Sequence, residues 1–242
     1  MTPTDRCLDL VRPRASDYAR CMSSFRFSLV AACLLGGLAA IALLPAAAAS
    51  DSAPLAPNAP VVLHVGDSFV HVGFTQTLSP KFRNAGIRYV VRAKHSLYIP
   101  TLVNGVGLAS LMRDHKPSLV ILNIGANEMR MPQPSDHAPA IRQVSELVSR
   151  EQTSCVWVTP PPPTDLGETG IVAEIKKNSS PCRVYDSTTI APQLERERFD
   201  NVHPTRQAGA RWAEAFWTWL QTERDPSSHG WRLKPRPPES PE

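Results

Sequence analysis

Hydrophobic positions in the middle of the chain alternate between two kinds of spacing. Short apolar runs rich in β-branched residues predict strands at 61–66, 88–93 and 118–125, with two more strands opening at Cys155 and Cys182. Apolar residues at helical spacing predict helices from Ser68 onward and over 101–115, 137–151, 170–177 and 204–222, where Trp212, Phe216 and Trp217 form a core stripe. Strands interleaved with helices predict an α/β fold, a three-layer α/β/α sandwich around a five-stranded parallel sheet.

The N-terminal segment differs sharply from this pattern. Residues 27–44 are uncharged, follow Arg26 and run into the small-residue stretch that ends at Ala49, which is typical of a signal peptide cleaved after Ala49. Eighteen uncharged residues also reach the lower limit for spanning a bilayer, so an uncleaved anchor is the open alternative. Translation from Met22 would give a shorter, more typical leader.

The chain thus divides into four predicted parts. Residues 1–49 are leader and signal peptide, 50–60 are a Pro-rich linker, 61–223 are the folded domain, and 224–242 are a disordered Pro-rich tail. We expect an exported protein, periplasmic or secreted, that is monomeric and has no stable membrane association after cleavage.

Charge and cysteine content refine this picture. The net charge of +4 falls to +2 without residues 1–49, and no Lys/Arg run with interleaved aromatics occurs, so nucleic-acid binding is not expected. Only Cys155 and Cys182 remain in the exported part, each at the start of a predicted strand. A disulfide between them suits an exported protein, and two buried free thiols are the equal alternative.

Candidate chemistry lies where predicted strands end, because ligands of open parallel sheets bind beyond the carboxyl ends of the strands. Gly66-Asp67-Ser68 follows the first strand, and Asp200-Asn201-Val202-His203-Pro204 precedes the last helix. We interpret Ser68 as a nucleophile, His203 as its base and Asp200 as the carboxylate that orients the base. Asp67 or Ser68 could instead simply cap a helix.

Asn127 extends this predicted site. It follows the central strand in Gly125-Ala126-Asn127, and its amide could stabilise an oxyanion together with the backbone N–H of Ser68, although Asn is also a common turn former. The Pro160–Pro163 loop and Arg130 could wall a pocket on the same edge. His64 and His71 are interpreted as structural, and no metal site is expected because no His or Cys pair has ligand spacing.

These motifs, in this order, resemble the SGNH (GDSL-type) hydrolases over roughly 61–220. The resemblance implies a flavodoxin-like sandwich with strand order 2-1-3-4-5 and ester hydrolysis without metal or cofactor. It also implies a backbone N–H donor after the second strand, where the family has a glycine. The corresponding position here is Ser96, in Lys94-His95-Ser96-Leu97, so the implied oxyanion hole comprises Ser68, Ser96 and Asn127.

The resulting hypothesis is a serine esterase that removes small acyl groups, O-acetyl above all, from an acylated small molecule or glycan at the cell surface or outside the cell. The expectation of a glycan substrate rests on an analogy with related exported enzymes. The alternatives are a lipase or thioesterase for longer acyl chains, an O-acetyltransferase, and a non-catalytic glycan-binding protein of the cell envelope.

Overall fold

A computed structural model describes residues 54–105, 107–228 and 230–235. Every described residue belongs to one unit, Ser50–Glu242. The predicted signal peptide, its cleavage after Ala49 and the start at Met22 therefore lie outside the described residues. Within the described ranges, none of the helices has the length and apolar character needed to cross a membrane.

The domain is built on one parallel sheet with strand order β2-β1-β3-β4-β5. The strands are β1 (Val61–Gly66), β2 (Arg88–Ala93), β3 (Leu119–Asn123), β4 (Ser154–Val158) and β5 (Arg183–Tyr185). All five residues of β3 are buried, as the apolar run predicts for a central strand covered on both faces. The predicted sandwich and its strand order are confirmed.

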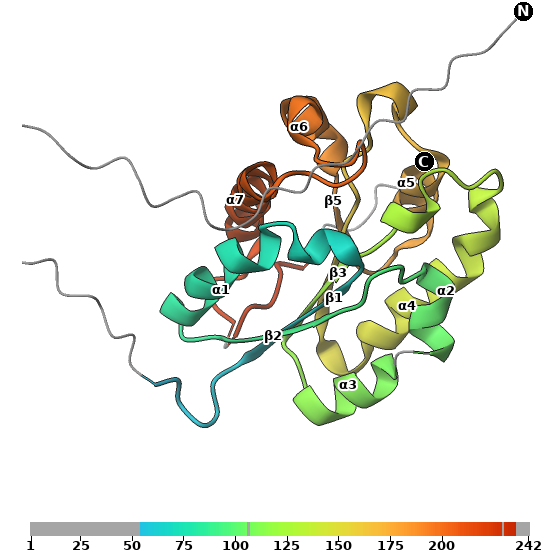
Figure 1. The fold of residues 1–242 in the computed structure, drawn as a ribbon. Coiled ribbons are helices and arrows are strands. Elements are labelled where there is room, and N and C mark those ends of the chain that lie inside the picture. The colour runs from blue at the N-terminus through green and yellow to red at the C-terminus, as the bar shows by residue number, and fades with distance from the viewer. Residues whose placement is uncertain (1–53, 106, 229, 236–242) are drawn as a thin grey trace, which may run out of the picture. The chain divides into compact units, whose positions relative to one another are not determined.

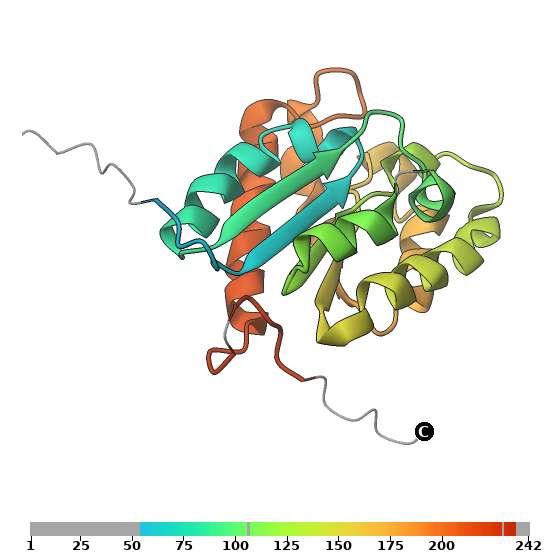
Figure 2. The same cartoon turned by 90° about the horizontal axis from the view of Figure 1, so that it is seen from below.

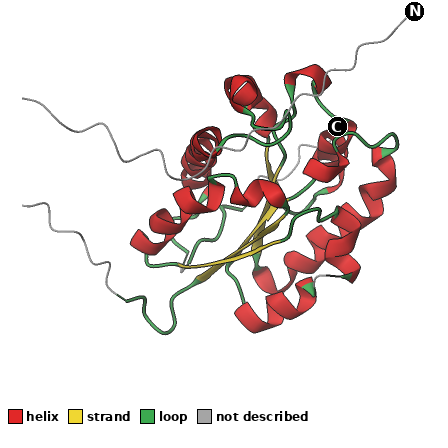
Figure 3. Ribbon diagram, in the orientation of Figure 1, coloured by secondary structure: helices red, strands yellow, loops and turns green. Residues whose placement is uncertain are grey.

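Helices cover both faces of the sheet (Figures 1, 2 and 3). The α-helices are α1 (Phe74–Asn84), α2 (Ile99–Asn104), α3 (Leu108–His115), α4 (Ala138–Val148), α5 (Gly170–Asn178), α6 (Ala191–Leu194) and α7 (Arg206–Glu223). Short 3-10 helices connect them: η1 (Ser68–His71), η2 (Ala126–Glu128), η3 (Pro134–His137), η4 (Arg150–Gln152), η5 (Thr164–Leu166), η6 (Ser187–Thr189) and η7 (Glu195–Glu197). Helices α1 and α7 pack together on one face, and α4 packs with α2, α3 and α5 on the other.

Two predicted helices are broken by glycines. The segment 101–115 is not one helix, because Gly105 ends α2 and Gly107 begins α3 with φ at 64°. Likewise, no α-helix starts at Ser68: one 3-10 turn follows, and Gly73, with φ at 88°, separates it from α1. Both Gly73 and Gly107 adopt the left-handed backbone that glycine tolerates best, and this conformation interrupts a right-handed helix.

The final helix supplies the aromatic core of its face. Trp212 and Phe216 are fully buried, and the ring centroid of Phe74 lies 4.6 Å from Trp212 and 5.5 Å from Phe216. Trp217 is only partly buried, at the margin of the core. The predicted apolar stripe is therefore confirmed for Trp212 and Phe216, and it anchors α7 to α1.

Residues 230–235 of the predicted tail contact the domain, which contradicts the disorder predicted for them. Trp231 is 1% exposed, with its ring centroid 4.8 Å from Trp217 and 5.2 Å from Phe82. Arg224 and Leu233 form an antiparallel bridge that returns the chain. Burial of the indole removes a large apolar surface from water and so stabilises this segment, although its prolines and charges are typical of disorder. Residues 236–242 of the predicted tail lie outside the described residues.

The start of the described chain also contacts the domain. The backbone N–H of Arg88 donates to the Pro60 carbonyl at 2.9 Å, and its guanidinium donates to the Pro57 carbonyl at 3.0 Å. The predicted linker over 50–60 therefore has its last residues placed against β2.

A disulfide joins Cys155 and Cys182 across the edge of the sheet. Parallel pairing places Val156 opposite Arg183, and this register brings the two preceding cysteines side by side. Of the two alternatives that the sequence leaves open, the structure contains the bonded pair.

Candidate active site

Ser68 lies directly after β1 and hydrogen-bonds to a histidine from the other end of the domain. Its Oγ is 2.7 Å from Nε2 of His203, and Nδ1 of His203 is 2.7 Å from Oδ2 of Asp200. The three residues interpreted from the sequence as nucleophile, base and orienting carboxylate therefore form one continuous hydrogen-bonded chain. Ser68 itself is buried, with 8% of its surface exposed.

The turn 198–204 holds Asp200 and His203 in register. Oδ1 of Asp200 accepts the backbone N–H of His203 at 2.6 Å and that of Val202 at 3.1 Å. Partial desolvation opposes ionisation of Asp200, but these bonds and the His203 ring hold its pKa below the ordinary value. Asp200 is therefore a carboxylate that can stabilise positive charge on the imidazole.

Close packing of α7 brings His203 to Ser68. A Cβ on Gly209 would lie 1.5 Å from the carbonyl oxygen of Val72, and one on Gly73 would lie 2.2 Å from that of Arg206. The first turn of α7 thus lies against the backbone that immediately follows the Ser68 turn. The helix begins at Arg206, with Thr205 Oγ1 accepting the N–H of Ala208 at 3.2 Å, and not at Pro204 as the sequence predicts.

Asp67 links the loop after β1 to the loop after β3. Its carboxylate accepts the backbone N–H groups of Phe69 at 2.9 Å, Gly125 at 3.2 Å and Ala126 at 3.1 Å. Burial raises the pKa of Asp67 to about 6, against the effect of these three bonds. The capping role considered from the sequence is thus present in the bond to Phe69, and a cross-link between the two loops is added to it.

Asn127 contacts the turn that contains Ser96. The Nδ2 of Asn127 donates to the Leu97 carbonyl at 2.9 Å, so the loop after β3 contacts the turn after β2. Ser96 has φ at 54°, the left-handed conformation that favours glycine. Among the described residues, the backbone N–H groups of Ser68 and Ser96 have no hydrogen-bond acceptor, so both can serve a ligand.

Glu128 is a buried carboxyl that sequence reasoning missed. Its Oε1 accepts the backbone N–H of Ile99 at 2.6 Å, while Oε2 has no hydrogen-bond partner among the described residues. Burial, reinforced by the neighbouring Asp67, raises the pKa of Glu128 to about 7. Its bond to Ile99 is a second contact between the loop after β3 and the chain that follows β2, in addition to that of Asn127 with Leu97.

Arg198 connects the turn of Asp200 and His203 to the proline-rich loop. Its side chain is 3% exposed, and its guanidinium donates to the carbonyl of Val202 and to those of Pro161 at 3.0 Å and Pro162 at 3.1 Å. Five fixed donors suit this bridging of several carbonyls. In the sequence Arg198 is one of several charges in a row, and no local pattern marks it as buried.

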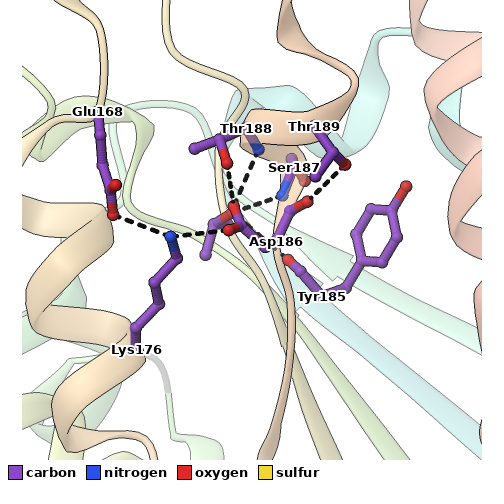
Figure 4. Close-up of polar contacts among 8 residues, drawn as sticks. Glu168, Lys176, Tyr185, Asp186, Ser187, Thr188 and Thr189 are labelled. Carbon is purple, nitrogen blue, oxygen red and sulfur yellow. Dashed lines mark hydrogen bonds and ion pairs between the residues drawn. The ribbon is translucent and has the colours of Figure 1, made fainter.

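A polar network fixes the far end of the same loop (Figure 4). Lys176 on α5 lies 2.9 Å from Glu168 and 2.7 Å from Asp186, which in turn accepts the hydroxyl of Thr188 at 2.7 Å. Next to it, Ser187 accepts a hydrogen bond from the buried Trp212 indole at 2.9 Å. The loop after β4 is thus tied at one end to α5 and β5, and at the other to Arg198.

Other residues singled out from the sequence lie outside the hydrogen-bonded chain. His64 is fully buried and hydrogen-bonds to Tyr89, and burial lowers its pKa to about 3. His71 stacks on His95 at 5.4 Å. Arg130 forms an exposed ion pair with Asp165 at 3.6 Å. Throughout the described part of the chain, no three His, Cys, Asp or Glu side chains gather closely enough to hold a metal ion.

Comparison with known structures identifies the class of fold. Twenty-eight solved chains match, and they include a member of the lipolytic G-D-S-L family from Veillonella parvula DSM 2008, with a TM-score of 0.53 and 13% identity over 67% of this chain and 99% of that one. The protein therefore has the fold of the SGNH (GDSL-type) hydrolases.

Two particular structures extend the likeness. TesA matches with a TM-score of 0.56 and 18% identity over 67% of this chain and 98% of its own. A mutant acetyl esterase, crystallised with an acetate ion, matches with a TM-score of 0.51 and 12% identity over 67% of this chain and 99% of its own. No protein-family model matches the sequence, and no curated protein matches it. The comparisons thus establish the fold, and the chemistry follows from the site.

Proposed function

We propose that this protein is a serine ester hydrolase that uses Ser68, His203 and Asp200. The observation that supports this proposal most directly is the hydrogen-bonded chain from Asp200 through His203 to the hydroxyl of Ser68. A serine beside a histidine base, with the base held by a carboxylate, is the arrangement that activates a hydroxyl for attack on an acyl group.

In the proposed reaction, Ser68 Oγ attacks the ester carbonyl while His203 Nε2 takes the hydroxyl proton. The negative charge on the carbonyl oxygen is stabilised by the N–H groups of Ser68 and Ser96 and by the amide of Asn127, and each such donor contributes about 3 kcal/mol in well-studied sites. His203 then gives the proton to the departing alcohol, which leaves an acyl group on Ser68. Water, activated by His203, releases the acid and restores the hydroxyl.

Asn127 is oriented for this role by its contact with the turn after β2. One amide hydrogen donates to the Leu97 carbonyl at 2.9 Å, and the second has no acceptor among the described residues. The contact restricts rotation of the amide, which supports a donor that is held before substrate arrives. Such preorganised donors are the ones that lower a barrier most, because they need no rearrangement during reaction.

The proposed substrates are small acyl esters, principally O-acetyl groups on a carbohydrate of the cell surface or outside the cell. The acetyl esterase of the same fold supports the small acyl group. The predicted signal peptide supports a substrate outside the cytoplasm.

Hydrolysis of 4-nitrophenyl acetate by the wild type and by Ser68→Ala tests the proposal. We expect the variant to lose at least about 1000-fold in kcat, because removing a triad nucleophile abolishes the covalent route. Ser135→Ala, an exposed serine in η3, is the matched control and should keep wild-type activity. Equal rates for wild type and Ser68→Ala would refute the proposal, as would failure of a fluorophosphonate to label Ser68.

A series of 4-nitrophenyl esters from acetate to laurate then separates the alternatives. Rates that fall with acyl length support the small-acyl proposal, whereas a preference for laurate would identify a lipase or thioesterase. Transfer of acetyl to an added sugar in place of acetate release would identify an O-acetyltransferase. Glycan binding without phosphonate labelling would identify a non-catalytic binding protein.

A further inference from the structure

Exposed large hydrophobic side chains are concentrated at the candidate active site. In the described part of the chain, the exposed ones are Phe199 at 65% and Tyr98 at 37%. Phe199 lies in the turn that carries Asp200 and His203, and Tyr98 follows Leu97, which accepts the Asn127 amide. An exposed aromatic ring beside a candidate catalytic residue is a candidate contact for a ligand.

The Phe199 ring lies directly on the catalytic turn. Its centroid is 5.4 Å from that of His203 with an interplanar angle of 18°, so the two rings are nearly parallel. His203 also contacts Phe69, at 5.1 Å, but that ring is 1% exposed and belongs to the core. Phe199 therefore presents apolar surface to solvent beside the imidazole that would serve the ester.

The backbone holds this exposed ring in place. The N–H of Phe199 donates to the carbonyl of His203 at 3.1 Å, and Arg198 pairs with Pro204 in an antiparallel bridge. The adjacent Arg198 is anchored by its buried guanidinium. A ring with a fixed backbone loses little further freedom when a ligand packs on it, which favours binding.

The surroundings of Phe199 indicate the kind of ligand. The residues close to it in the chain that are exposed, Arg196, Asp200 and Asn201, are polar, so this turn exposes no second large apolar side chain. A long acyl chain needs a continuous apolar groove to bury its methylenes. A sugar ring has one face of C–H groups and a rim of hydroxyls, and its C–H groups carry the partial positive charge that an aromatic face attracts.

We propose that Phe199 is the platform on which the ring of an acylated sugar stacks while its ester reaches Ser68. This inference rests on the proposed esterase function. It places the sugar, which is the alcohol part of the ester, against the turn that carries His203. Phe199 then sets specificity by binding the sugar and takes no part in bond making.

The test compares two acetates with and without a sugar ring: methyl glucopyranoside acetylated on its primary hydroxyl, and ethyl acetate. Acetate release is followed for the full-length wild type, Phe199→Ala, Phe199→Leu and Phe199→Trp. We expect kcat/KM for the sugar ester to fall about fivefold to tenfold in the Ala and Leu variants, mainly through KM, and to be retained in Phe199→Trp. For ethyl acetate, all variants should stay close to wild type.

Each other result overturns the inference. An equal loss on both esters would show that the ring serves only to hold His203, and no loss on either would show that the ring is not used. Failure of the esterase proposal is distinguishable, because the wild type would then hydrolyse neither ester and Ser68 would resist a fluorophosphonate. Thermal unfolding of each variant checks that folding is intact, as expected for a side chain that is 65% exposed.

Discussion

The buried carboxyl of Glu128 makes the stability of the domain depend on pH, and Glu128→Gln should remove the contribution of this group. Glutamine keeps an oxygen that can accept the Ile99 N–H, and it resembles the protonated acid. The variant therefore mimics the form of Glu128 that the folded state prefers. It also removes the charge that Glu128 would carry near Asp67 at higher pH.

The magnitude follows from the difference between the folded and unfolded pKa. Burial raises the pKa of Glu128 from 4.5 to about 7 in the folded protein, so between these values the folded state binds the proton more tightly. Stability is then greatest below pH 4.5 and falls as the pH rises through 7, because the folded state must either keep a proton or bury a charge. The full span corresponds to about 3 kcal/mol.

Urea unfolding of wild type and variant at pH 4.5, 6 and 8, followed by tryptophan fluorescence, measures this effect. We expect the free energies of unfolding to differ least at pH 4.5 and to shift in favour of Glu128→Gln by about 3 kcal/mol towards pH 8. The exposed Glu146 on α4 offers a control, since Glu146→Gln should follow the wild-type pH curve. A difference between wild type and Glu128→Gln that stays constant across the range would refute the reasoning.

Three further changes probe the scaffold. Arg198→Lys should lower kcat about tenfold to a hundredfold, because the turn bearing His203 loses its tie to the proline-rich loop; a lower Tm with unchanged kcat would assign the guanidinium to stability alone. Ser96→Gly should retain activity and release up to about 1 kcal/mol of left-handed strain, whereas a hundredfold loss in kcat would show that the hydroxyl is used. Reducing the disulfide between Cys155 and Cys182, 27 residues apart, should cost about 3 to 4 kcal/mol in urea unfolding, and a Cys-to-Ala double variant should not respond to reductant.

The sheet could be predicted from sequence because its residues signal their environment locally. The residues Leu119–Leu122 of β3 are all apolar, and such an unbroken apolar run is typical of a strand that is covered on both faces. The helix breaks at Gly73 and Gly107 were missed because the apolar spacing continues across them. Trp231 was missed for the opposite reason, since a single aromatic among prolines has no periodicity to reveal where it packs.

The proposed reacting groups and the residues that hold them in place differ in how easily a sequence reveals them. The roles of Ser68 and His203 could be proposed from the sequence because the α/β pattern predicts which edge of the sheet each residue occupies. They are also the residue types that acyl transfer requires. Glu128 and Arg198 resemble ordinary surface charges, and only tertiary packing makes them buried. Ser96 lies between these cases, because its position came from a family resemblance and its left-handed backbone became known from the structure.

Three buried polar side chains divide the site into two separately supported halves. Asp67 and Glu128 accept backbone N–H groups and tie together the loops after β1, β2 and β3, which carry the proposed oxyanion donors. Arg198 donates to backbone carbonyls and ties the turn of His203 to the loop after β4. Each side chain is matched to the backbone group that it meets, carboxyl oxygen to N–H and guanidinium to C=O. These hydrogen bonds can therefore hold loops of irregular sequence in a fixed geometry, and Ser68 lies where the two halves meet, hydrogen-bonded to His203.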